Sequence, residues 1–239
     1  MIKAVCFDLD GTLLPLDIDE FCKYYFGMLA RKMVGHGYEP HALIDAIKEG
    51  TEDMYRNDGT ATNEQVFWKR FCSIFGEQAK ADMPYFEEFY ETEFDKARVA
   101  CGFDADAAPT VQRCLDMGLA VCAATNPLFP EIATRKRLSW AGVDPKSVSF
   151  YTTYEDCSFC KPSKGYFLDV AARLGVAPEE CLMVGNDADE DLAAERVGMK
   201  VFLLKNEYLL NRSGRDISAY PQGDFKDLLA YIDRLQGAE

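Results

Sequence analysis

The chain has 239 residues, 48% of them hydrophobic, enough for one large α/β domain or for a core of about 150 residues with a smaller inserted domain. Its 40 acidic and 26 basic residues give a formal charge of -14, which repels nucleic acids and anionic membrane surfaces. The sequence has no run of 18 apolar residues and no basic, apolar leader pattern, so we expect neither membrane spanning nor secretion.

The cysteines indicate the redox compartment. There are 9 of them, an odd number, and several lie in apolar segments, namely Cys6, Cys114, Cys122 and Cys181. This pattern favours reduced thiols over a disulfide framework, so we expect a cytoplasmic location.

Short apolar segments that stop at polar loops predict buried strands. They are Ala4–Leu9, Leu119–Ala124, Val148–Thr152, Cys181–Val184 and Val201–Leu204. Helical patterns that end at glycine lie between them, at residues 109–117, 130–141, 163–174 and 189–197. The alternation predicts a doubly wound α/β fold with a parallel sheet, and such sheets bind ligands beyond the carboxyl ends of their strands.

One long segment breaks this alternation. From about residue 17 to residue 99 no strand is convincing, and the pattern is that of successive helices. The clearest helix begins after Thr62, which together with Gln65 suits a capping box, and a second one runs from Pro84 with aromatic residues on one side. We therefore predict an inserted helical domain.

Two carboxylates stand at the end of the first predicted strand, in the sequence Phe7-Asp8-Leu9-Asp10-Gly11-Thr12. Acids so close together suit divided roles, one as a nucleophile and the other as a proton donor to the leaving group. A DxDGT sequence at this place resembles the first motif of the haloacid dehalogenase-like (HAD) superfamily. The resemblance implies that Asp8 forms an aspartyl phosphate and that Asp10 is the general acid and base. It also implies that Thr12 positions substrate or supports Asp10.

Two further segments are similar to the next motifs of that superfamily. Thr125 and Asn126 follow the second core strand, where a hydroxyl and backbone amides would hold phosphate oxygens. Lys161, in the sequence Lys161-Pro162-Ser163, resembles the lysine ahead of a helix that stabilises the nucleophile and the phosphoryl charge. The basic run 135–137, in the predicted helix 130–141, is expected to be a solvated helix face.

The last motif is acidic and runs from Gly185 to Asp191. In the commonest family pattern an aspartate directly follows the glycine, whereas this chain has Asn186 there and Asp187 next. Magnesium prefers a few carboxylates together with water and phosphate oxygens, so the resemblance implies a Mg²⁺ site formed by Asp8, the Asp10 carbonyl and Asp187. Asp189 is the alternative ligand, and Asp191 would orient Lys161 or a metal-bound water. Glu190 is expected to be an exposed acid at a helix start.

The resemblance thus implies a Rossmann-like core of residues 1–15 and 102–239 and a C1-type helical cap of residues 16–101. The predicted activity is Mg²⁺-dependent hydrolysis of a small phosphorylated metabolite, since a cap restricts access. A phosphosugar mutase of the same superfamily and a non-catalytic phosphometabolite-binding module remain as alternatives. A dehalogenase is disfavoured because Asp10 is present, and no lysine in residues 16–101 has the context expected of a phosphonate hydrolase.

Overall fold

The computed structural model describes residues 1–237 and contains one parallel sheet with the order β3-β2-β1-β4-β5-β6. The six strands are β1 (Ala4–Phe7), β2 (Ala120–Ala123), β3 (Phe150–Tyr151), β4 (Cys181–Gly185), β5 (Lys200–Leu204) and β6 (Gln222–Gly223). Every pairing is parallel, so the predicted α/β fold class is confirmed. The two-residue strand β6 was not predicted from the sequence.

The central strand β1 is buried on both faces. All four of its residues are inaccessible to solvent, and Val5 pairs with Val121 of β2 on one side and Leu182 of β4 on the other. A strand covered on both faces needs a continuous apolar sequence, as found here. The order reverses at β1, whose neighbours β2 and β4 come later in the chain. Because the crevice of such a sheet opens at this reversal, residues that follow β1 and β4 lie at its ligand-binding edge.

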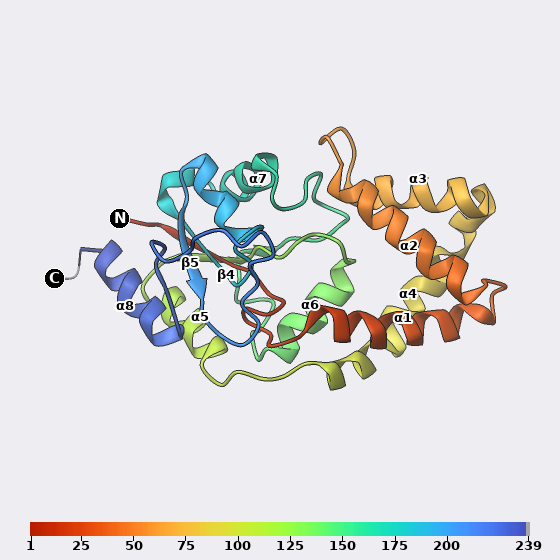
Figure 1. Ribbon diagram of the computed structural model, residues 1–239, viewed down its shortest axis with the longest axis horizontal. Helices are drawn as coiled ribbons and strands as arrows, with labels where there is room; N and C mark the ends of the chain where they lie inside the picture. Colours follow the sequence, from red (N-terminus) through yellow and green to blue (C-terminus); the bar gives the residue numbers. More distant parts are fainter. Residues whose placement is uncertain (238–239) are drawn as a thin grey trace.

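Helices pack on both faces of the sheet (Figure 1). They are α5 (Ala107–Asp116), α6 (Glu131–Trp140), α7 (Lys164–Leu174) and α8 (Phe225–Leu235), with the 3-10 helices η3 (Pro178–Glu180) and η4 (Asp191–Val197). Ser163 caps α7 by accepting a hydrogen bond from Gly165 N, and the helix ends at Gly175 in the left-handed conformation. Two apolar clusters, one for each face, form the core around the sheet.

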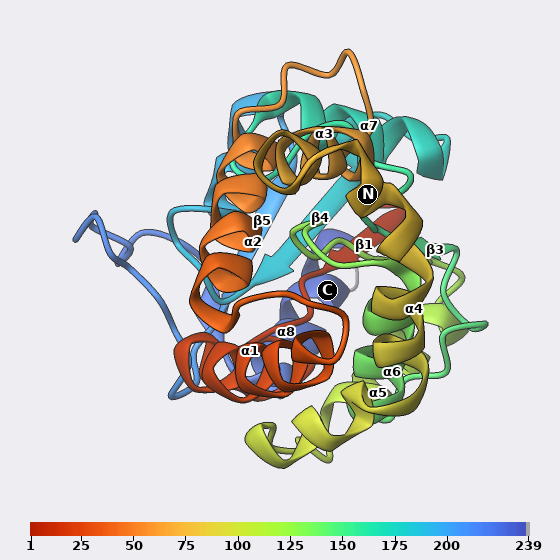
Figure 2. The ribbon, with the colours of Figure 1, turned by 90° about the vertical axis from the view of Figure 1, so that its right-hand side faces the viewer.

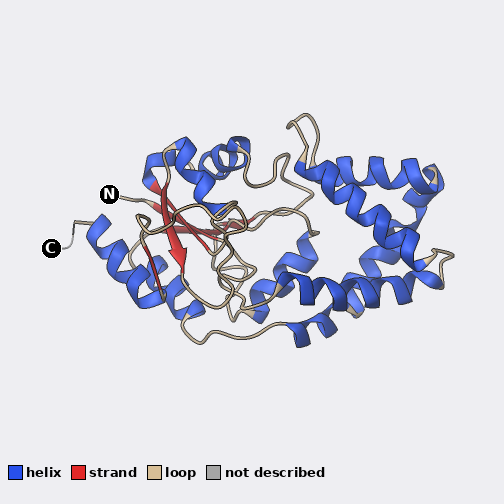
Figure 3. Cartoon of the chain, viewed as in Figure 1, coloured by secondary structure: helices blue, strands red, loops and turns tan. Residues whose placement is uncertain are grey.

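The segment between β1 and α5 contains helices and no sheet strand. These helices are α1 (Ile18–Val34), α2 (Pro40–Tyr55), α3 (Asn63–Phe75) and α4 (Met83–Thr92), with the 3-10 helices η1 (Glu77–Asp82) and η2 (Phe94–Ala100). They gather at one end of the molecule, away from both termini, while the strands are confined to the other part (Figures 1 and 3). The capping box of Thr62 and Gln65 is present at the start of α3.

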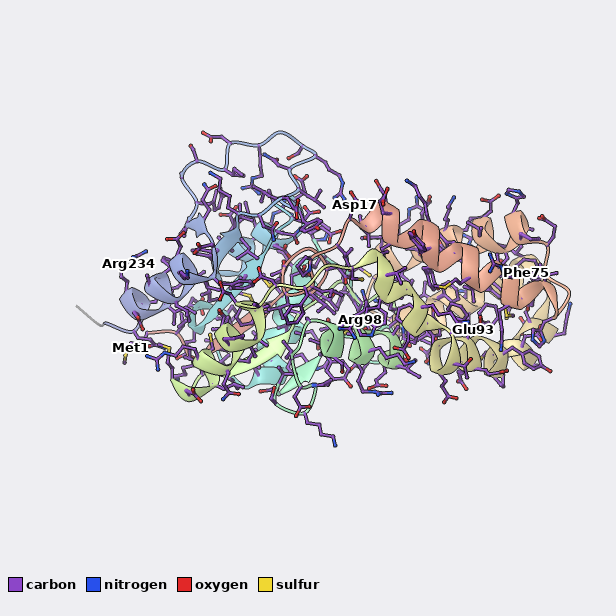
Figure 4. The ribbon with its side chains drawn as sticks, turned by 90° about the horizontal axis from the view of Figure 1, so that it is seen from below. Met1, Asp17, Phe75, Glu93, Arg98 and Arg234 are labelled. Atoms are coloured by element: carbon purple, nitrogen blue, oxygen red, sulfur yellow. The ribbon has the colours of Figure 1, made fainter. Side chains whose placement is uncertain are left out.

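The helical segment lies over one end of the sheet. Viewed from that end, α1 to α4 stand in front of the strands (Figure 2). Asp17 and Arg98 lie near its junction with the sheet-containing part, and Phe75 lies at the far end (Figure 4). A cluster of aromatic rings, including Phe71, Trp68 and Phe86, holds the helices together with ring centroids 5.2 to 5.5 Å apart. Within residues 1–237, no helix is long and apolar enough to cross a membrane.

Candidate active site

A cavity of about 240 Å³ opens at the carboxyl ends of β1, β2 and β4. Carboxylates from two separate loops line it, those of Asp8, Asp10, Asp187, Glu190 and Asp191, together with Thr125, Asn126 and Arg212. The sheet topology explains this meeting, because the loops after neighbouring parallel strands emerge at the same edge.

Lys161 is the centre of the site. Its side chain is only 1% exposed, and Nζ lies 2.9 Å from Asp8 Oδ1 and 2.6 Å from Asp191 Oδ1. Burial by itself lowers the pKa of Lys161, but the carboxylates of Asp191 and Asp8 outweigh burial and raise it above the ordinary value. Lys161 is therefore protonated at neutral pH.

Thr12 and Asn186 complete the surroundings of Asp8. Thr12 Oγ1 lies 3.1 Å from Asp8 Oδ2 and 3.0 Å from Asn186 Oδ1. Of the two roles expected for Thr12, positioning substrate or supporting Asp10, neither is tested by these contacts with Asp8 and Asn186. Gly11 has a φ of +82° and a Cβ there would lie 2.3 Å from Asn186 Nδ2. Only glycine fits this close turn, which brings Asn186 against the loop after β1.

Asp10 is paired with Arg137 of α6. The Arg137 side chain is 0% exposed, donates from Nη1 to Asp10 Oδ2, and lies 4.3 Å from the ring centroid of Phe129. Burial raises the pKa of Asp10, and the Arg137 guanidinium opposes this effect. Among residues 1–237, Asp10 Oδ1 is buried without a hydrogen-bond partner. The expectation of a solvated face for residues 135–137 was therefore wrong for Arg137, because α6 turns that side chain inward.

Asp187 occupies the end of β4 and is held by its own loop. Its Oδ1 accepts hydrogen bonds from the backbone of Asp189 and Glu190, at 2.8 and 3.1 Å, and its Oδ2 forms an ion pair with Arg212 at 2.7 Å. The alternative ligand, Asp189, does not line the cavity and bonds to Ser213 instead. Of the two candidate ligands, Asp187 is thus the one that lines the cavity.

The predicted helix at residues 189–197 is shorter than expected. It is the 3-10 helix η4, which begins at Asp191 because the Asp187 carboxylate binds the first free amides of the loop. Asp191 Oδ1 accepts a hydrogen bond from Lys161 Nζ, and Asp191 Oδ2 accepts one from Asp187 N at 3.0 Å. Gly185 makes room for it, since a Cβ at Gly185 would lie 1.9 Å from Asp191 Oδ2.

Thr125 and Asn126 follow β2, and Thr125 is buried at the cavity wall. Asn126 already has protein partners: Oδ1 accepts from Lys161 N at 3.2 Å, and Nδ2 donates to Glu190 Oε2 at 3.0 Å and to Tyr55 Oη at 3.2 Å. A phosphate oxygen would have to replace one of these bonds. Tyr55 comes from α2, so this group also joins the helical segment to the sheet edge.

Glu190 was expected to be exposed, and this was wrong. It lines the cavity, where Asn126 and Tyr55 bind its carboxylate. Burial raises the pKa of Glu190 to about 7, with Lys161 opposing and the neighbouring carboxylates of Asp191 and Asp187 adding to the effect. Burial likewise raises the pKa of Asp191, against the opposing charge of Lys161. The cavity therefore has more negative charge than its own cations neutralise.

Sequence reasoning missed three contributors: Arg137, Arg212 and Tyr55. Arg212 lies in the loop after β5, which reaches the site through backbone hydrogen bonds of Leu210 with Asn186 and Ala188, both at 2.8 Å. No local sequence pattern predicts these contacts, because each depends on how segments far apart in the sequence pack against one another.

The fold and this edge define a doubly wound α/β hydrolase with a lysine held between two aspartates. Residues 2–198 match the haloacid dehalogenase-like hydrolase family, and the chain belongs to it.

Known proteins are similar over most of their length. The chain is 24% identical over 218 residues to the "Putative phosphatase YhcW" of Bacillus subtilis, covering 87% of this chain and 85% of that protein. It is 25% identical over 202 residues to the "Glyceraldehyde 3-phosphate phosphatase" of Methanopyrus kandleri, covering 83% and 82%. The crystal structure of a HAD phosphatase from Thermococcus onnurineus superposes with a TM-score of 0.54 and 21% identity, covering 100% and 99%. The structural similarity supports the fold.

Proposed function

We propose that the protein hydrolyses a phosphate monoester of a small metabolite, with Mg²⁺, through an aspartyl phosphate on Asp8. The observation that supports this most is the buried Lys161, which forms ion pairs with Asp8 and Asp191, two of the carboxylates that line the cavity. Such a lysine holds the Asp8 carboxylate in position as a nucleophile and supplies positive charge for a phosphoryl group in an otherwise acidic protein.

In the proposed first step, an Asp8 carboxylate oxygen attacks phosphorus in line with the ester oxygen. The new bond joins Asp8 to phosphorus, the bond to the ester oxygen breaks, and Asp10 gives its proton to the leaving alcohol. Asp10 then takes a proton from water as the water attacks phosphorus, which releases phosphate and restores Asp8. The raised pKa of Asp10 suits the donor role, and Lys161 offsets the negative charge of the equatorial oxygens.

The residues present fit Mg²⁺. Asp8, Asp187 and the Asp10 carbonyl are hard oxygen donors, and a divalent cation would offset the negative charge of the carboxylates that line the cavity. In the described part of the chain, no three His, Cys, Asp or Glu side chains form a ready-made metal cluster, so water and substrate oxygens would complete the shell. When bound, Mg²⁺ would polarise the phosphoryl group and offset its charge.

We further propose that residues 16–101 act as a cap over a core of residues 1–15 and 102–239. The helices α1 to α4 lie over the ligand-binding end of the sheet, and Tyr55 of α2 contacts Asn126 and Glu190 there. A cap favours a small substrate, and the related proteins named above as phosphatases support that class. The free thiols of all nine cysteines and the charge of -14 support a cytoplasmic enzyme that does not bind nucleic acid.

The experiment is phosphate release from a panel of phosphorylated metabolites, with Mg²⁺ and with EDTA, using wild type and Asp8→Asn. We expect turnover that EDTA abolishes and Asp8→Asn lacks, while the circular dichroism of the variant stays that of wild type. Retained turnover in Asp8→Asn would reject the nucleophile. Binding of phosphate esters without turnover in wild type would favour a binding module instead.

A further inference from the structure

A second cavity, of about 160 Å³, lies beside the catalytic one. Ile18, Leu128 and Phe129 line both cavities, so the second begins where the first ends. Its remaining walls come mainly from the helical segment: Cys22, Tyr25, Phe26, Leu29, Ile47, Thr51, Phe67, Trp68, Phe86 and Tyr90, with Pro130 and Tyr154 from the core. It has room for at least five water molecules at ~30 Å³ each.

The walls of this cavity carry no charged side chain. They contain no Lys, Arg, His, Asp or Glu, and most of their atoms are aliphatic or aromatic carbon. The hydroxyls of Tyr25 and Tyr90 bind each other at 2.6 Å, and burial raises the pKa of both, so they remain neutral. Arg137, which lies 4.3 Å from the ring centroid of the wall residue Phe129, is already paired with Asp10.

One polar group in the wall lacks a partner. Trp68 Nε1 is buried and, within residues 1–237, forms no hydrogen bond. Its side chain is 6% exposed, so water does not readily replace the missing acceptor.

We propose that this cavity holds the leaving group of the substrate, and that the substrate is a phosphate ester of an uncharged, largely apolar alkyl or aryl alcohol. The inference rests on the proposed phosphatase function. With the phosphoryl group beside Asp8, the alcohol carbon chain passes Ile18, Leu128 and Phe129 into the apolar space. A carboxylate or second phosphate there would be buried without a counter-charge, which is costly.

The test compares kcat/KM for straight-chain alkyl phosphates from methyl to pentyl, for phenyl phosphate and for the phosphate ester of 4-hydroxybutanoate. Acetyl phosphate, whose leaving group is too small to fill the cavity, reports on the core chemistry. We expect kcat/KM to rise about 4-fold for each methylene, the factor for burying one CH₂. We expect the hydroxybutanoate ester to be at least about 100-fold poorer than pentyl phosphate, because its carboxylate is left unpaired.

A pair of variants on α2 locates the effect. Ile47→Phe fills the cavity and should reduce the ratio of pentyl phosphate to acetyl phosphate kcat/KM by at least 10-fold. Ile44→Phe is the matched control, since Ile44 is half-buried on the same helix and does not line this cavity. The control should keep the wild-type ratio.

The possible outcomes separate the two proposals. Acetyl phosphate turnover with no gain along the alkyl series, or with preference for the charged ester, would overturn the leaving-group assignment and leave the phosphatase intact. An equal loss of the ratio in Ile44→Phe would also overturn it. No phosphate release from any compound, acetyl phosphate included, would overturn the phosphatase function and the inference together.

Discussion

Replacing Lys161 by methionine removes the cation that bridges Asp8 and Asp191, at 2.9 and 2.6 Å. The lysine side chain is 1% exposed, so water cannot take its place for either carboxylate. Breaking a buried ion pair in this way costs about 3–5 kcal/mol of unfolding free energy. For a chain of this size each kcal/mol lowers Tm by about 2–4 °C, so we expect a fall of roughly 6–20 °C.

The pH dependence of this loss has a definite sign. In wild type the raised Lys161 pKa means that its stabilisation is fully present below the ordinary lysine pKa and is lost only at higher pH. In Lys161→Met the unpaired carboxylates must take up protons to relieve the burial cost. The difference in unfolding free energy should therefore be larger at pH 8 than at pH 5.

The assays are denaturant unfolding at both pH values and Mg²⁺-dependent phosphate release. We expect kcat to fall by about 10²–10³, as when a fixed donor to a developing charge is removed. Lys164→Met is the matched control, because Lys164 is exposed at the start of α7 and should behave as wild type. Unfolding free energy within about 1 kcal/mol of wild type at pH 8, with kcat unchanged, would refute the reasoning.

Three other changes follow from the same geometry. Gly185→Ala should displace Asp191, because the new Cβ would lie 1.9 Å from Asp191 Oδ2. We expect the variant to lose most phosphate release and to have a lower Tm, and wild-type values of both would contradict this. Glu190→Gln, measured in EDTA, should stabilise the fold by up to about 3 kcal/mol above pH 7. The reason is that the pKa of Glu190 is raised from 4.5 to about 7, so ionising this carboxyl in the folded protein lowers the unfolding free energy. That gain should vanish below about pH 4.5, and a gain independent of pH would disprove the cause. Arg212→Gln should lower the Mg²⁺ concentration for half-maximal activity by about 1.4- to 5-fold, because it frees Asp187 from an ion pair worth about 0.2–1 kcal/mol, whose arginine is 59% exposed. An increase in that concentration would count against Asp187 as a ligand.

The sheet could be predicted from the sequence because its signals are local. Buried parallel strands require continuous apolar sequences, and Ala4–Phe7 and Cys181–Gly185 have them. The capping box at Thr62 likewise depends only on residues three apart. By contrast, β6 has two residues, too few for any periodicity, and forms because it pairs with the edge of β5.

The site could be predicted only in part, and for a related reason. Residues directly after β1 and β4 meet because parallel strands end at one edge, and the motifs that contain Asp8 and Asp187 follow these two strands. Arg137 was placed on a solvated face because neighbouring Arg135 and Lys136 are polar, and only the packing of α6 against the loop after β1 turns it inward. Glu190 was expected to be exposed because its contact with Tyr55, a residue of α2, depends on how the helical segment packs over the sheet edge.

The most direct test of the central claim is to trap the phosphoryl group on the enzyme. Wild-type protein mixed with substrate and Mg²⁺ should be quenched in acid before the steady state, digested and analysed by mass spectrometry. We predict that the peptide containing Asp8 gains the mass of one phosphoryl group, that borohydride converts that residue to homoserine, and that Asp8→Asn shows neither change. Rapid phosphate release with the phosphoryl group on another residue, or with no phosphorylated enzyme at any time, would contradict the account.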